Sequence, residues 1–217
     1  MASVAAALFD NDGLTLETES AWTRAEHVLF GRHGVAFTPE HKRELLGTSP
    51  AESATRMQRM LGAPGEQLIA ELHELAMAEL AAGVQPRPGA VALLGALREA
   101  GVPVGLVSNS RREWVALGLH HAGLADAFDV VVCFEDVERP KPAPDAYVAA
   151  AQALGAEPDE CAVLEDSPTG VAAGRAAGAL TIGVPSLPGV VLDADVVAGS
   201  LADDAVWRAL GLVASVP

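Results

Sequence analysis

The chain has 217 residues, of which 50% are hydrophobic, and its formal net charge is −15. This acidity excludes a general affinity for nucleic-acid phosphates or anionic lipid, since both need a basic surface. No apolar stretch is long enough to span a bilayer, and no basic segment typical of a secretory signal stands at the N-terminus, so we expect a cytoplasmic protein without nucleic-acid or membrane partners. Cys133 and Cys161 lie in apolar segments, which is typical of buried free thiols.

The first predicted element is a short buried strand at residues 4–9, which runs directly into Asp10-Asn11-Asp12-Gly13. Two carboxylates at positions i and i+2 of an extended segment point to the same side. At the carboxyl end of a parallel strand, where ligands bind, such a pair needs a cation, and carboxylate oxygens favour Mg²⁺. Asp and Gly are also ordinary turn residues, so the motif taken alone is more typical of an acidic turn.

The chain then changes character twice. Up to residue 83 the patterns are helical and contain no strand, with helices expected at 20–31, 39–46, 51–61 and 65–82. From residue 90, helices alternate with short β-branched runs. We expect helices at 90–100, 112–122, 144–154, 170–177 and 203–210, and strands at 102–107, 130–134, 161–164, 179–184 and from 190 or 196 onward. This alternation predicts an α/β fold with a parallel sheet covered on both faces.

Three further polar clusters follow predicted strands. Ser108 and Asn109 offer a hydroxyl and amide N–H groups that suit an anion, although capping the next helix is their commoner use. Lys141 is flanked by prolines, so a stiff loop presents its ammonium group, whereas a lone lysine is usually a solvated charge. Glu165 and Asp166 close a later strand and form a second acidic pair, which would share a metal ion with the first.

An acidic pair, a hydroxyl and amide cradle, a rigid lysine and a second acidic pair, in that order, indicate a phosphoryl-transfer site. With these motifs the chain resembles the haloacid dehalogenase superfamily of hydrolases, in the branch that holds sugar phosphatases and β-phosphoglucomutase. The resemblance implies a Rossmann-like core of residues 1–14 and 84–217 and an inserted helical cap of residues 15–83. It also implies a Mg²⁺ cofactor, a small phosphorylated metabolite as substrate, and a monomer or weak dimer.

The resemblance also implies a role for each motif residue. Asp10 would be the nucleophile that forms an aspartyl-phosphate, and Asp12 would be the general acid and then the general base. Family members that dehalogenate carbon lack the second aspartate because a departing halide needs no proton, so Asp12 favours phosphate-ester chemistry. Phosphate would be held by Ser108, the Asn109 amide and Lys141. The metal would be held by Asp10, the Asp12 carbonyl oxygen and Asp166. Glu165 would assist the metal either by binding it directly or by acting through hydrogen bonds.

In this branch the cap determines the substrate, and four cap residues are candidates. Glu19 is placed to bind sugar hydroxyls or simply to favour the start of its helix through the helix dipole. Trp22 would close over a sugar ring, although a tryptophan in an amphipathic helix is more often part of a core. Thr48 and Ser49 belong to the segment that aligns with the cap loop of the mutases.

Two alternatives to a phosphatase remain open at this point. Mutases of the branch carry a histidine where Trp22 stands and a basic pair around the cap loop, and both features are missing here, which favours hydrolysis. Arg43 or Arg56 would still supply a contact to a distal phosphate, which keeps the mutase alternative.

A phospho-acceptor binding module like a response-regulator receiver also joins acidic residues, metal and lysine, but receivers carry the acceptor on a later strand and have no helical insertion. The role of Asn11, where relatives usually have an apolar residue, is open.

Overall fold

The computed structural model describes residues 4–45, 50–187 and 189–212 of the chain. The chain divides into two compact units, one formed by Met1–Glu17 with Gln85–Pro217 and the other by Thr18–Val84. The expected cap residues Thr48 and Ser49 lie outside the described residues. The boundaries that we expect between core and cap, at residues 14/15 and 83/84, stay predictions.

The larger unit contains a six-stranded sheet in the order β3-β2-β1-β4-β5-β6, in which each neighbouring pair of strands is parallel. The strands are β1 (Ala6–Asp10), β2 (Val104–Val107), β3 (Val130–Val132), β4 (Cys161–Glu165), β5 (Leu180–Gly183) and β6 (Val196–Val197). Every residue of β1, β2 and β4 is buried, which is why these strands read as continuous apolar runs in the sequence. The predicted α/β fold with a parallel sheet is confirmed.

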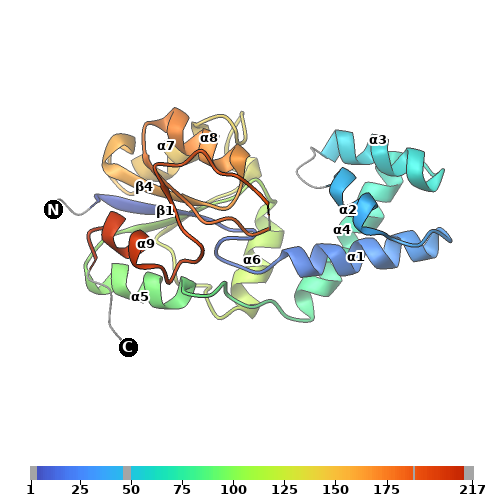
Figure 1. The fold of residues 1–217 in the computed structure, drawn as a ribbon, viewed down its shortest axis with the longest axis horizontal. Coiled ribbons are helices and arrows are strands. Elements are labelled where there is room, and N and C mark those ends of the chain that lie inside the picture. The colour runs from blue at the N-terminus through green and yellow to red at the C-terminus, as the bar shows by residue number, and fades with distance from the viewer. Residues whose placement is uncertain (1–3, 46–49, 188, 213–217) are drawn as a thin grey trace. The chain divides into compact units, whose positions relative to one another are not determined.

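Helices cover both faces of this sheet, with α5 and α9 on one face and α7 and α8 on the other (Figure 1). The helices of the larger unit are α5 (Ala90–Glu99), α6 (Arg112–His121), α7 (Asp145–Ala153), α8 (Pro168–Ala177) and α9 (Asp204–Ala209), together with the short 3-10 helices η1 (Phe134–Asp136) and η2 (Pro158–Glu160). Small alanines let α7 lie close to the central strands, where its Tyr147 packs in one buried cluster with Leu8 and Val163.

The strand expected at 130–134 is shorter in the structure. β3 ends at Val132, and η1 begins at Phe134. The Cys133 N–H donates to the Asp136 carboxylate at 2.7 Å, and this local hydrogen bond turns the backbone out of the extended conformation. The sequence prediction missed this turn because a run of Val, Cys and Phe is typical of a strand.

The strand order places a topological switch between β1 and β4. From β1 the chain continues to β2 and β3 on one side of the sheet, and then crosses to β4, β5 and β6 on the other side. In open parallel sheets, ligands bind outside the carboxyl ends of the strands at such a point. β1 ends at Asp10 and β4 ends at Glu165, so both acidic motifs lie at this switch point.

The smaller unit consists of helices. They are α1 (Glu19–Arg32), α2 (Pro39–Leu45), α3 (Pro50–Leu61) and α4 (Gly65–Ala81), and α4 packs against both α1 and α3. Buried side chains such as Leu29 of α1 and Leu72 of α4 form its interior. Across the described parts of the whole chain, the helices are all too short or too polar to cross a membrane.

Candidate active site

Lys141 connects the first and last motifs of the candidate site. Its side chain is buried, and its Nζ donates hydrogen bonds to Asp10 Oδ1 at 2.6 Å, to Glu165 Oε1 at 2.7 Å and to the carbonyl oxygen of Val107 at 2.9 Å. An ammonium group has three N–H donors, so all of them are used and the charge is held in one position. Burial by itself lowers the pKa of Lys141, but Asp10 and Glu165 outweigh it and raise the pKa above its usual range.

The side chain of Asn109 positions the loop that carries Lys141. Its amide nitrogen donates to the Lys141 carbonyl oxygen at 3.0 Å, and its amide oxygen accepts from the Lys141 N–H, also at 3.0 Å. These two bonds pair Asn109 with the backbone of Lys141 much as neighbouring strands pair. This pairing uses the amide oxygen and one of the two amide N–H donors, so we expect the phosphate contact of Asn109 to come from its backbone N–H.

Glu165 is held from within the protein by five donors. Its Oε1 accepts from Lys141 Nζ and from the Tyr147 hydroxyl, both at 2.7 Å. Its Oε2 accepts from the Asp166 N–H at 3.1 Å, the Ser167 N–H at 3.3 Å and the Ser167 hydroxyl at 3.0 Å. A carboxylate offers about four lone-pair positions, so its acceptor capacity is filled. Of the two ways in which Glu165 was expected to assist a metal, this geometry favours the indirect one.

A glycine in the first turn of α8 makes room for this carboxylate. A Cβ atom on Gly170 would lie 1.7 Å from Glu165 Oε1 and 1.8 Å from its carboxyl carbon. The carboxylate thus lies against the N-terminal turn of α8, whose helix dipole favours a negative charge. The glycine is required here for space, because its backbone conformation is ordinary for a helix.

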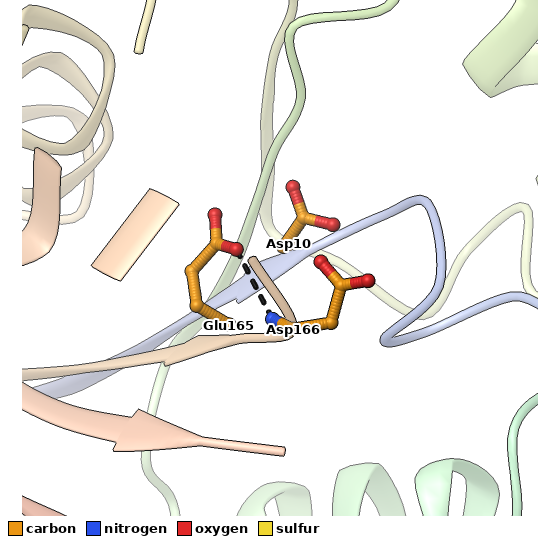
Figure 2. Close-up of side chains that lie close together, drawn as sticks. All are labelled: Asp10, Glu165 and Asp166. Carbon is orange, nitrogen blue, oxygen red and sulfur yellow. Dashed lines mark hydrogen bonds between the residues drawn. The ribbon is translucent and has the colours of Figure 1, made fainter. Parts of the chain in front are cut away.

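Asp10, Glu165 and Asp166 form an acidic cluster (Figure 2). One carboxylate oxygen from each lies within 4.8 Å of the others. Burial, and then the charge of Glu165, raise the pKa of Asp10 well above its usual range, and the same causes raise the pKa of Asp166 to about 7. One ammonium group, that of Lys141, faces these three carboxylates, so the buried cluster carries an excess of negative charge. Asp10 and Asp166 therefore fit a further cation bound through oxygen, such as Mg²⁺.

Asp12 belongs to the same turn but has different partners. Its Oδ1 accepts from the Trp114 indole N–H at 2.7 Å, and its Oδ2 accepts from the hydroxyls of Ser110 at 2.8 Å and Ser108 at 3.2 Å. The turn directly after Asp12 needs glycine, since Gly13 has φ +84 and a Cβ there would meet Asp166 Oδ2 at 2.2 Å. The two aspartates therefore serve separate networks, one around Lys141 and one around α6.

The expected site residues are divided between the two units of the chain. The structure brings together Asp10, Asp12, Ser108, Asn109, Lys141, Glu165 and Asp166 at the carboxyl edge of the sheet, while their catalytic roles stay predictions. Glu19 and Trp22 belong to α1 of the other unit and are both half-buried. Glu19 is the first residue of α1 and forms an ion pair with Lys42 Nζ at 2.5 Å, which favours a structural role for its carboxylate.

Sequence reasoning missed several residues that support this site. The Thr15 hydroxyl donates to the Asp10 carbonyl oxygen at 2.6 Å, and a hydrogen bond from Ser186 lowers the pKa of Asp166 against the larger effects of burial and Glu165. Ser110 follows Ser108 and Asn109 directly, so its place in that motif was a usable signal. Trp114 and Tyr147 gave no such signal, because a buried aromatic residue on a helix reads as ordinary core.

A comparison with known families matches residues 4–178 to the haloacid dehalogenase-like hydrolases. The chain belongs to this family. It is 38% identical over 179 residues to hexitol phosphatase A of Escherichia coli (strain K12), covering 82% of this chain and 81% of that one. It is 33% identical over 202 residues to the bifunctional riboflavin kinase/FMN phosphatase of Arabidopsis thaliana, covering 90% of this chain and 53% of the relative, so it spans about half of that protein's length.

A solved structure supports the same membership. The haloacid dehalogenase family hydrolase from Deinococcus radiodurans R1, crystallised with bound phosphate and sodium, has a TM-score of 0.82 and 31% sequence identity, with 100% of both chains covered. The family match begins at residue 4 and ends at residue 178, so it includes the whole acidic cluster and Lys141. The resemblance that the sequence motifs indicated is thus confirmed, and the chain is an enzyme of this hydrolase family.

Proposed function

We propose that this protein is a Mg²⁺-dependent phosphatase that hydrolyses a small sugar phosphate or sugar-alcohol phosphate through an aspartyl-phosphate on Asp10. The observation that carries the proposal is the cluster at the switch point, where Lys141 bridges Asp10 and Glu165 and Asp166 lies beside them. The names of the relatives, a hexitol phosphatase and an FMN phosphatase, support the reaction class and the size of the substrate.

The residues of this chain would hold Mg²⁺ through the carboxylates of Asp10 and Asp166 and the carbonyl oxygen of Asp12. Glu165 acts through its hydrogen bonds, since five donors already occupy it. When bound, the ion supplies positive charge that neutralises phosphate oxygens and keeps the nearby carboxylates ionised. Lys141 supplies the second positive charge beside Asp10.

In the first half of the reaction, a carboxylate oxygen of Asp10 attacks phosphorus. The bond between phosphorus and Asp10 forms as the ester P–O bond breaks, and Asp12 donates its proton to the departing alcohol oxygen. The Ser108 hydroxyl and the Asn109 backbone N–H hold phosphoryl oxygens, and Lys141 neutralises the charge that they carry. The product of this half is the free alcohol and a phosphorylated Asp10.

In the second half, Asp12 is a carboxylate and acts as the base. It takes a proton from a water molecule whose oxygen attacks phosphorus, and the bond to Asp10 breaks to release phosphate. Both aspartates return to their starting states. The sequence Asp10-Asn11-Asp12 thus carries the nucleophile and the proton carrier on one turn, each held by its own network of donors.

Substrate choice belongs to the cap, where Glu19, Trp22, Thr48 and Ser49 are the candidates. The cap sequence favours hydrolysis over phosphoryl isomerisation, because Trp22 stands where mutases of the branch carry a histidine. Arg43 donates to the Pro39 carbonyl oxygen at 3.2 Å, and Arg56 donates to the carbonyl oxygen of Glu44. Each of these bonds uses one of the five N–H donors of its guanidinium group, so Arg43 or Arg56 still keeps the mutase alternative open.

The test is phosphate release by the purified protein with Mg²⁺ from a panel of hexitol phosphates, hexose phosphates and FMN. We expect many turnovers on at least one compound, and loss of turnover in Asp10→Asn. Full turnover by Asp10→Asn would overturn the mechanism. Interconversion of glucose 1- and 6-phosphates with little free phosphate would identify a mutase instead. Arrest after one equivalent would identify a phospho-acceptor module.

A further inference from the structure

Trp114 makes an unusual hydrogen bond for a core tryptophan. It is 2% exposed in the first turn of α6, and its indole N–H reaches Asp12 Oδ1 at 2.7 Å. Trp207 of α9, which is 8% exposed, shows the ordinary arrangement, since its indole N–H donates to the nearby carbonyl oxygen of Leu201 at 3.1 Å. The Trp114 N–H is instead directed at a carboxylate of the candidate active site.

The three donors to Asp12 differ in what they can do. A serine hydroxyl rotates and is both a donor and an acceptor, so Ser108 and Ser110 can turn their oxygens toward a proton on Asp12 Oδ2. An indole N–H is only a donor, and its direction is fixed by a buried ring. A proton on Oδ1 would face the indole hydrogen, whereas a proton on Oδ2 meets two adaptable hydroxyls.

We propose that Trp114 is a positioning residue for the acid and base chemistry of Asp12. Its N–H holds Oδ1 and so assigns the proton to Oδ2, the oxygen on the side of the phosphate-binding Ser108. Ser108 is shared, because its hydroxyl contacts Asp12 and is also placed to bind phosphate. When that hydroxyl turns to a phosphate oxygen, Trp114 and Ser110 keep the carboxylate in position. Trp114 has this role only if the protein is the phosphatase proposed above.

The experiment compares Trp114→Phe with Trp207→Phe on two substrates of nearly equal shape, p-nitrophenyl phosphate and phenyl phosphate. Phenolate is the more basic leaving group and depends more on a proton from Asp12. We expect Trp114→Phe to lower kcat/KM for phenyl phosphate about tenfold and for p-nitrophenyl phosphate about threefold or less, since a misplaced proton donor slows the step that needs it most. Trp207→Phe loses the same kind of N–H far from Asp12 and should leave the ratio of the two values unchanged.

A positioning role of Trp114 and a merely structural one give different results here. An equal loss on both substrates, which leaves the ratio of their kcat/KM values unchanged, overturns the role of Trp114. Phosphate release by the wild type still supports the proposed function in that case. No release from either aryl phosphate or from the metabolite panel overturns both. A second measurement does not depend on the folding of Trp114→Phe. In Asp12→Ala the indole proton resonance of Trp114 should move upfield and that of Trp207 should stay, and an unmoved Trp114 resonance also overturns the proposal.

Discussion

Each unit of the molecule contains a lysine between two carboxylates, and only one of these clusters has the properties of an active site. In the larger unit, the Lys141 side chain is 3% exposed and bridges Asp10 and Glu165. In the smaller unit, the Lys42 side chain is 21% exposed and lies 2.5 Å from Glu19 and 2.8 Å from Glu26. We refer to these as the Lys141 cluster (Lys141, Asp10, Glu165 and Asp166) and the Lys42 cluster (Lys42, Glu19 and Glu26).

The two clusters differ in charge balance and in position. Asp166 gives the Lys141 cluster a third carboxylate, and the cluster lies at the carboxyl edge of the sheet where the strand order reverses. The Lys42 cluster joins α1 to α2. Among the described ion pairs of the cap, Lys42 pairs with two carboxylates, those of Glu19 and Glu26. A lysine held between two carboxylates therefore does not by itself mark a site. Excess negative charge at a strand-end switch point is the feature that marks it.

The largest expected difference between the clusters is in turnover. Lys141→Met removes the ammonium group that donates a hydrogen bond to Asp10 and that we propose to neutralise the phosphate, so we expect kcat on p-nitrophenyl phosphate to fall about 100-fold or more. Lys42→Met breaks a partly exposed ion pair, which acts mainly on stability, so kcat should change less than about threefold. Steady-state kinetics on the two purified variants checks this, and an equal loss in both would erase the distinction.

The second expected effect concerns the way Glu165 is held. In Gly170→Ala the new methyl group would occupy the position of the Glu165 carboxylate, which then loses its donors. We expect a loss of about 2–3 kcal/mol in the free energy of unfolding and about tenfold or more in kcat. Gly95→Ala in α5 is the matched control, because no atom lies within 4 Å of its Cβ position. It should gain about 0.5–1 kcal/mol, and urea melts of both variants compare them directly.

Metal binding should stabilise one cluster and not the other. Mg²⁺ at about 100 times its Kd should add about 2.7 kcal/mol to the free energy of unfolding and so raise Tm. Asp166→Asn removes a carboxylate that we propose as a metal ligand of the Lys141 cluster, and we expect it to abolish the shift. Glu26→Gln, in the Lys42 cluster, should keep it. Thermal melts with Mg²⁺ or with EDTA measure the shift without any substrate, and a shift retained by Asp166→Asn would contradict this metal site.

The smallest expected effect comes from a polar residue between the two aspartates. Asn11 is fully buried, and within the described part of the chain neither polar atom of its side chain has a hydrogen-bond partner. Asn11→Leu should therefore raise the free energy of unfolding by about 1 kcal/mol. Thr181→Val is the contrasting variant, since the buried Thr181 hydroxyl donates to Asp195 at 2.7 Å, and it should lower stability by about the same amount. A loss of stability in Asn11→Leu would show that the amide has a favourable environment.

Sequence reasoning predicted the layout of the larger unit because its parallel strands are buried on both faces. The apolar runs that end at Asp10 and Glu165 could then be aligned at one edge of the sheet, which placed the acidic motifs side by side. The expected start of α6 at residue 112 agrees with the structure, whereas α8 begins at Pro168, two residues before the expected start, because Ser167 caps it by accepting from the Gly170 N–H. Strand ends and helix starts are signals within a short stretch of sequence, and most of the candidate site residues were predicted from them.

The partners of the site residues could not be predicted in the same way. Trp114 and Tyr147 act through polar atoms whose targets lie 102 and 18 positions away in the chain. In the sequence each is an apolar residue on the buried face of a helix, and the direction of its N–H or O–H depends on tertiary packing. The filled acceptor capacity of Glu165 is likewise visible only when all of its donors are in place. Pattern identifies the charged groups of a site, whereas packing determines which oxygen of each group is used.

The most direct test of the central claim is to locate the phosphoryl group during turnover. The wild-type protein is mixed with Mg²⁺ and p-nitrophenyl phosphate, quenched in acid and digested, and the peptides are analysed by mass spectrometry. We predict one phosphoryl group on Asp10 in the wild type and none in Asp10→Asn. Steady turnover without a phosphorylated Asp10, or a phosphoryl group on another residue, would contradict the account.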